Sequence, residues 1–95
     1  TVQGYLSVVK SGAVETWGEA LADIVSVLYL KKTVPDAWLR FAGGIASMRH
    51  DLARRWPQHD TSPWLRRVIA ADPQVADNQS IFDVAFELRR QFRPQ

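Results

Sequence analysis

Apolar residues recur at steps of three and four along most of this 95-residue chain, which is the spacing of one face of an α-helix. No stretch of useful length alternates between apolar and polar residues, as a half-buried strand would. The sequence therefore predicts an all-α fold. The first apolar series is Val14, Trp17, Leu21, Ile24, Val25 and Leu28.

Prolines and capping residues separate the apolar series and place the helix boundaries. Pro57 should end the second helix, and Ser62 followed by Pro63 should begin the third. Thr33 is expected to cap the second helix, and Asp77 or Asn78 the fourth. The four main helices are predicted at about 13–32, 34–56, 63–71 and 78–92.

The chain is short enough to form one domain with a modest core, so its stability should be marginal unless a partner adds buried surface. Residues 1–12 fit either a short fifth helix or an extended arm, and Gly12 is expected to end this segment. The apolar residues in it are Tyr5, Leu6, Val8 and Val9.

The second helix carries an apolar stripe along more than five turns, which also includes Phe41 and Met48. Gly43 and Gly44 lie in its middle, where each costs about 1 kcal/mol relative to alanine. Close approach of another helix backbone is the preferred reason for them, and a kink is the second. The spine of the core is predicted to be Trp38, Ile45, Leu52 and Trp56.

Three acidic residues, Glu15, Glu19 and Asp23, follow one another at four-residue steps on the face opposite the first apolar series. We expect them to form an acidic ridge. His50 and His59 are nine residues apart with a proline between them, which is not the spacing that brings two imidazoles to one metal ion. The chain has no cysteine, so the sequence predicts neither a metal site nor a cofactor.

The segment RHDLARRWPQHD, residues 49–60, holds the densest group of polar side chains. Arg54, four further residues and His59 resemble the Arg-x4-His signature of HEPN-type ribonucleases, in which both residues lie in one helix. Here Trp56 and Pro57 interrupt the predicted helix. We therefore predict no catalytic residues, no enzyme activity and no small-molecule substrate.

Aromatic residues are numerous for four short helices, with four tryptophans, four phenylalanines and two tyrosines. Aromatics and arginines are the residue types enriched at interaction hot spots. The sequence therefore favours a non-catalytic interaction or accessory module that docks with itself or with a larger assembly. Trp17, Phe86 and Phe92 are expected to be covered in part by the partner. In a homo-oligomer, the acidic ridge of one copy would meet the arginine-rich end of another.

Binding of a nucleic-acid backbone is the alternative function. Nine of the twelve basic residues are arginines, whose guanidinium groups bind phosphate in a bidentate manner. Against this, the formal net charge is only +2, which is low for a dedicated nucleic-acid-binding domain. The residues expected to contact phosphate or an acidic partner are Arg49, Arg54, Arg55, Arg66 and Arg67.

The compartment is predicted to be intracellular. The chain lacks cysteine and a positively charged leader, and its longest apolar run, residues 24–30, is far shorter than the ~20 residues of a membrane-spanning helix. We accordingly expect no association with a membrane.

Overall fold

The computed structural model describes the backbone of residues 2–94 and the side chains of residues 15–94. It confirms the predicted all-α class with four main helices, and the described residues form no strand. The elements are α1 (Val2–Thr33), η1 (Pro35–Ala37), α2 (Trp38–Leu52), η2 (Pro57–His59), α3 (Ser62–Ala71) and α4 (Ile81–Gln91), where η marks a single turn of 3-10 helix.

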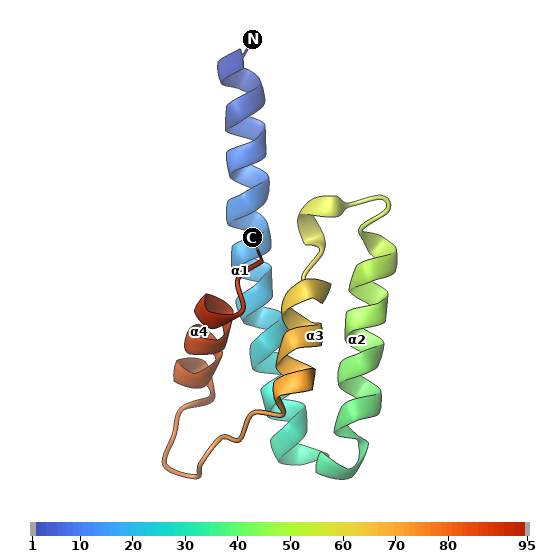
Figure 1. Cartoon of the computed structure of the whole chain (residues 1–95), viewed down its shortest axis with the longest axis vertical. Helices are drawn as coiled ribbons and strands as arrows, with labels where there is room; N and C mark the ends of the chain where they lie inside the picture. The colour runs from blue at the N-terminus through green and yellow to red at the C-terminus, as the bar shows by residue number, and fades with distance from the viewer. Residues whose placement is uncertain (1, 95) are drawn as a thin grey trace.

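The first helix is one continuous element from Val2 to Thr33, so residues 2–12 form neither a separate fifth helix nor an extended arm. A single glycine costs only about 1 kcal/mol in a helix interior, and Gly12 therefore does not end α1. The N-terminal half of α1 projects beyond the other helices, with the N-terminus at its far end (Figure 1). The side chains of Tyr5, Leu6, Val8 and Val9 lie outside the described residues.

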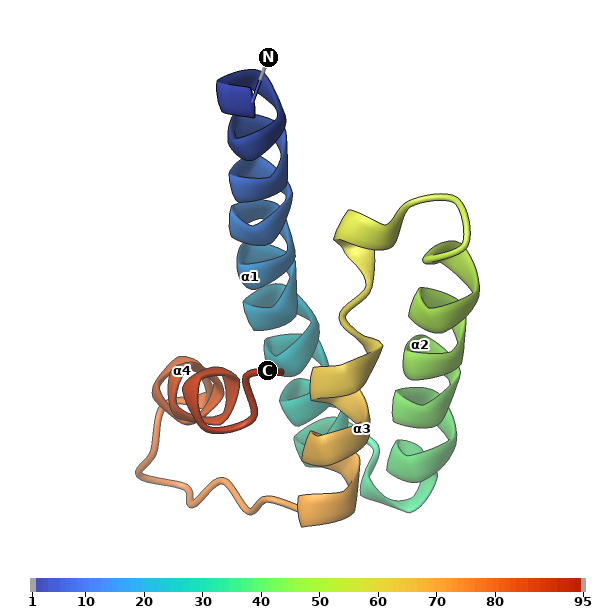
Figure 2. The same cartoon turned by 45° about the horizontal axis from the view of Figure 1, so that its top comes forward.

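The C-terminal half of α1 lies at the centre of the bundle. Helices α2 and α3 pack on one side of it, and α4 packs on the other (Figures 1 and 2). The buried core draws on all four helices and consists of Ala20, Ile24, Val27, Leu28, Trp38, Ala42, Ala46, Trp64, Leu65, Val68, Ala85 and Leu88.

Helix α2 packs through a different face from the one predicted. Trp38 is buried and Ile45 is half-buried, but Leu52 and Trp56 are 42% and 48% exposed, so the predicted four-residue spine is wrong in its second half. The buried residues of α2 are instead Trp38, Ala42 and Ala46. Apart from Trp38, the large apolar side chains of α2 are therefore exposed or only half-buried.

Two polar contacts explain this orientation of α2. At its N-terminal end, the indole Nε1 of Trp38 donates a buried hydrogen bond of 3.0 Å to the carbonyl oxygen of Val27 in α1. At its C-terminal end, Arg49 binds Asp23 of α1. Both anchors lie on the same side of α2 as Ala42 and Ala46, whose small side chains let the helices approach closely.

The two glycines of α2 have a different setting from the one predicted. A β-carbon added to Gly43 or Gly44 would meet no atom within 4 Å, apart from the helix's own backbone. The helix continues through both residues without a break. Close approach of another helix of this chain therefore does not explain them.

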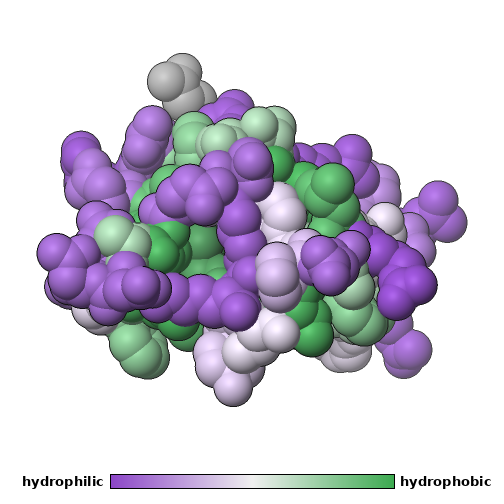
Figure 3. Space-filling model, turned by 90° about the horizontal axis from the view of Figure 1, so that it is seen from below, coloured by the Kyte–Doolittle hydropathy of each residue, from purple (hydrophilic) through white to green (hydrophobic). Residues whose placement is uncertain are grey.

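The connection between α3 and α4 is longer than predicted. Helix α3 stops at Ala71, and Asp72 adopts a left-handed conformation with φ of 48°. The fourth helix begins only at Ile81, and its cap is Ser80, rather than Asp77 or Asn78. The connecting residues border a hollow of about 490 Å³ with an apolar floor and a hydrophilic rim (Figure 3).

The start of the second helix also differs from the prediction. Thr33 belongs to α1, where its hydroxyl donates to the carbonyl oxygen of Tyr29, so it does not cap the second helix. The turn η1 intervenes before α2 begins at Trp38. Among the described residues, no helix combines the length and the apolarity needed to cross a membrane.

Candidate functional site

The first notable region is a polar seam, which we define as Glu15, Glu19 and Asp23 of α1 together with Arg49, His59 and Thr61. The three acidic residues occupy successive turns of one face of α1 because they are four residues apart. Helix α2, the turn η2 and the start of α3 bring the other three residues against that face. The acidic ridge therefore contacts other segments of the chain, although the Glu15 side chain at its outer end is 47% exposed.

Asp23 holds the seam together at its most buried point, with only 8% of its surface exposed. Its carboxylate accepts hydrogen bonds from Nε and Nη2 of Arg49, at 2.8 and 3.1 Å. The hydroxyl of Thr61, which is fully buried, donates to the same carboxylate at 2.5 Å. A carboxylate that is enclosed in this way is stable because bidentate, charge-assisted hydrogen bonds replace its water.

Arg49 is consequently committed to a contact within the chain. Its hydrogen bond to Asp23 raises its pKa above the ordinary value for arginine, and the negative charges of Asp23 and Glu19 act in the same direction against the opposing effect of burial. The structure thus places Arg49 apart from the other arginines predicted to contact phosphate. The sequence suggested that the acidic ridge of one copy meets arginines of another copy. In the structure, Glu19 and Asp23 of this ridge pair with Arg49 of the same chain.

His59 occupies the outer end of the seam. Its Nδ1 is in hydrogen-bond contact with Glu19 Oε1, and its Nε2 lies 3.3 Å from Glu15 Oε1. The other carboxylate oxygen of Glu19, Oε2, is buried without a hydrogen-bond partner and lies 3.9 Å from Nη1 of Arg49. A histidine and two carboxylates are a set of groups able to bind a transition-metal ion.

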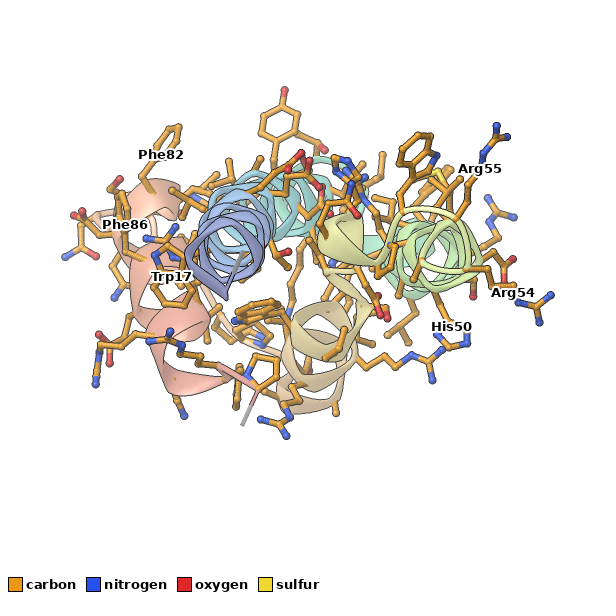
Figure 4. All side chains as sticks on the ribbon, turned by 90° about the horizontal axis from the view of Figure 1, so that it is seen from above. Trp17, His50, Arg54, Arg55, Phe82 and Phe86 are labelled. Carbon is orange, nitrogen blue, oxygen red and sulfur yellow. The ribbon has the colours of Figure 1, made fainter. Side chains whose placement is uncertain are left out.

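Sequence reasoning missed this arrangement because His59 lies 40 residues from Glu19 along the chain. Its side chain reaches α1 through the fold of η2, which no local spacing reveals. The ring nitrogens of His59 face α1. Arg54 points outward from the end of α2 (Figure 4), so the structure does not assemble the Arg-x4-His pair.

The second region is the α2 stripe, which we define as Phe41, Ile45, Met48 and Leu52. These residues recur at steps of four, three and four and so share one face of the helix. Three of them are exposed, including Met48 at 48%, and Ile45 is half-buried at the edge of the core. Exposed Trp56 follows Leu52 by four residues. A contiguous exposed apolar surface of this kind typically marks an interaction site.

Charged side chains border the α2 stripe. Arg40 lies with its guanidinium 5.3 Å from the ring of Phe41, and Arg55 lies similarly 5.7 Å from Trp56. Within residues 15–94, no ion pair involves Arg40, Asp51 or Arg55. These charges remain accessible to a partner.

Four of the five arginines predicted to bind phosphate are exposed: Arg54, Arg55, Arg66 and Arg67. Arg54 and Arg55 follow the end of α2 and point away from the bundle, Arg54 on the side of His50 and Arg55 on the other side (Figure 4). Arg66 and Arg67 belong to α3, and Arg67 donates a 3.4 Å hydrogen bond to the carbonyl oxygen of Phe92.

The three aromatic residues predicted to meet a partner have different environments. Trp17 is half-buried beside Trp64, with ring centroids 6.0 Å apart, and the Arg89 guanidinium lies 4.1 Å from the Trp17 ring centroid. Burial lowers the pKa of Arg89.

The two phenylalanines predicted to meet a partner differ from each other. Phe92 is half-buried against the core, whereas Phe86 is exposed on the outer side of α4 with Phe82 (Figure 4). The structure itself thus covers part of Trp17 and Phe92.

Comparisons with known proteins add no family to this description. No family model matches the chain, and searches of curated proteins and solved structures give no significant match.

Proposed function

We propose that this domain is a non-catalytic interaction module that associates with a second copy of itself through the α2 stripe, with the two α2 helices antiparallel. The exposed face of α2 carries the observation behind this proposal: large apolar side chains stand outside the core, and unpaired charges border them. Complete burial of such a side chain contributes about 1.5–3 kcal/mol, and because these are about half-exposed, each would add roughly 1–1.5 kcal/mol in an interface.

The spacing of the α2 stripe suits an antiparallel pair. Phe41 and Leu52 are equally distant from the point between residues 46 and 47, and so are Ile45 and Met48. A twofold axis at that point would set Phe41 against Leu52 of the other copy, and Ile45 against Met48. The same patch would then serve both copies, as an isologous interface requires.

The charges beside the stripe favour the same orientation. Arg40 and Asp51 lie on one flank of α2, since their positions differ by about 20° around the helix at 3.6 residues per turn. The same twofold axis brings Arg40 to the level of residue 53 in the other copy, about 3 Å along the axis from Asp51. Each dimer would gain two such pairs, whereas parallel helices would align like charges.

Gly44 provides space for the contact. It is exposed, precedes Met48 by one helical turn and has open space where a side chain would stand. Small residues at a helix surface let a second helix approach closely. In the dimer, the open space beside Gly44 would be filled by the α2 helix of the other copy.

The mass in solution tests the proposal. We expect sedimentation equilibrium at micromolar concentration to give about twice the chain mass of 10.8 kDa. Met48→Glu should weaken dimerisation by ~100-fold, because the dimer interface loses both Met48 side chains, one from each copy, at a combined cost of roughly 3 kcal/mol.

Leu39→Glu provides the matched control. Leu39 is a 64% exposed residue of α2 that lies off the stripe, so this variant should dimerise like the native chain. A native chain that stays monomeric at high concentration would overturn the proposal. Equal effects of the two substitutions would show that the α2 stripe is not the interface.

A nucleic-acid backbone is the second candidate partner, and it is favoured by the exposure of Arg54, Arg55, Arg66 and Arg67. Within the described residues, none of these four forms an ion pair. This candidate predicts binding to single-stranded nucleic acid that weakens steeply with salt. Replacing Arg54 and Arg55 together by alanine should reduce binding, and an absence of salt dependence would reject the candidate.

A further inference from the structure

We propose that Glu15, Glu19 and His59 bind one divalent transition-metal ion of the Zn²⁺ class at the outer end of the polar seam. The site joins α1 to η2, two segments that are distant in sequence. It is separate from the α2 stripe, so this inference does not depend on self-association.

The distances among the three side chains suit a small cation. One ligand atom from each residue lies within 4.8 Å of the other two. Ligands at 2.0–2.2 Å from a tetrahedral zinc ion lie about 3.4 Å from one another. His59 Nε2 and Glu15 Oε1 are already 3.3 Å apart. An imidazole offers one nitrogen to an ion, so Glu19, which now contacts Nδ1, would have to turn toward Nε2, and water would take the fourth position.

A second observation concerns the unmatched oxygen of Glu19. Its Oε2 atom is buried and accepts no hydrogen bond, although its neighbour Oε1 is in contact with His59. A buried carboxylate oxygen without a partner is costly. The nearest cationic group to this oxygen is Nη1 of Arg49, 3.9 Å away, and a cation bound by both oxygens of Glu19 would give it a closer partner.

The chemistry of the three groups selects the class of ion. One imidazole with two carboxylates suits Zn²⁺ and related first-row ions, whereas Ca²⁺ and Mg²⁺ prefer a shell of six or more oxygens. Two carboxylates neutralise the ion's two positive charges. Arg49 also faces Glu19, but its guanidinium is bound to Asp23.

Isothermal titration of the full chain with ZnCl₂ at pH 7.5 tests the site. We expect one ion per chain, and a visible absorption spectrum of low-symmetry tetrahedral form when Co²⁺ replaces Zn²⁺. His59→Ala and Glu15→Gln should each reduce affinity at least tenfold. The Glu15 side chain is 47% exposed, so Glu15→Gln should fold and tests the site even if His59→Ala does not fold.

His50→Ala is the matched control, because His50 is the other histidine of the chain and is exposed on α2. This variant should bind Zn²⁺ like the native chain. Three results would overturn the site: no binding by the native chain at millimolar Zn²⁺, unchanged affinity in Glu15→Gln, or equal losses in the two histidine variants.

Discussion

The polar seam and the α2 stripe reverse the usual distribution of polarity. In the seam, Asp23 is enclosed with Arg49 and Thr61, although charged residues are rarely buried unless paired. On the stripe, Met48 and Leu52 remain about half-exposed, although burying each would be favourable. Both regions involve α2. The orientation of this helix about its axis turns Arg49 toward Asp23 and, at the same time, leaves Met48 and Leu52 exposed.

The comparison shows what determines the orientation of a helix in a small bundle. Packing the stripe inward would bury more apolar surface from α2, but it would take Arg49 away from Asp23 and the Trp38 indole away from Val27. An unpaired buried charge costs several kcal/mol. The polar anchors therefore decide the rotation, and the apolar face that remains outside is available for association.

Loss of the central carboxylate should have the largest effect. Asp23→Ala leaves Arg49 partly buried without its partner, and we expect the free energy of unfolding to fall by about 3 kcal/mol. Urea denaturation followed by circular dichroism would measure the change. The double variant Asp23→Leu with Arg49→Met should recover part of it, since no unpaired charge remains and only the buried hydroxyl of Thr61 loses its acceptor. A single variant as stable as the native chain would show that the pair does not anchor α2.

Reversing one charge beside the stripe should have a smaller effect. Arg40→Asp would place two acidic groups together at each end of an antiparallel dimer, and we expect dimerisation to weaken by ~10-fold, or about 1.4 kcal/mol. Combining Arg40→Asp with Asp51→Arg should restore it. Sedimentation equilibrium would measure both variants. If the double variant is weaker than the single one, the helices do not pair in the antiparallel register.

Adding a methyl group at Gly44 should stabilise the monomer by about 0.5–1 kcal/mol. Alanine has the higher helix propensity, and its β-carbon would meet open space. Thermal unfolding at a concentration below the dimer dissociation constant would measure the gain. Gly43→Ala should behave similarly in the monomer. A loss of stability would instead indicate that another part of this chain packs closely on the glycine.

Between pH 5 and 9, titration of Arg49 should have no effect on stability. The hydrogen bond to Asp23 raises its pKa in the folded state, and a cation with a raised pKa contributes its full stabilisation below its unfolded-state pKa. The contribution would decline only at strongly alkaline pH. Urea denaturation of the native chain and the double Leu/Met variant should therefore differ by a constant amount across this range.

Local patterns in the sequence predicted much of the fold. The three- and four-residue spacing predicted helices, and prolines placed the start of α3 within one residue. Boundaries that depend on weaker signals were less accurate: a glycine did not end α1, and the cap of α4 is Ser80 because its hydroxyl accepts the 3.4 Å hydrogen bond from the Asp83 amide.

The sequence alone determined the helical class, the four main segments and the amphipathic character of α2, because these depend on residues a few positions apart. Only the tertiary structure decided which face of α2 is buried and that His59 and Arg49 meet the acidic residues of α1. Those contacts join residues 26 to 44 positions apart, and their free energies depend on burial and partner geometry. A periodic pattern identifies a helical face, but the strongest available pairing selects the face that turns inward.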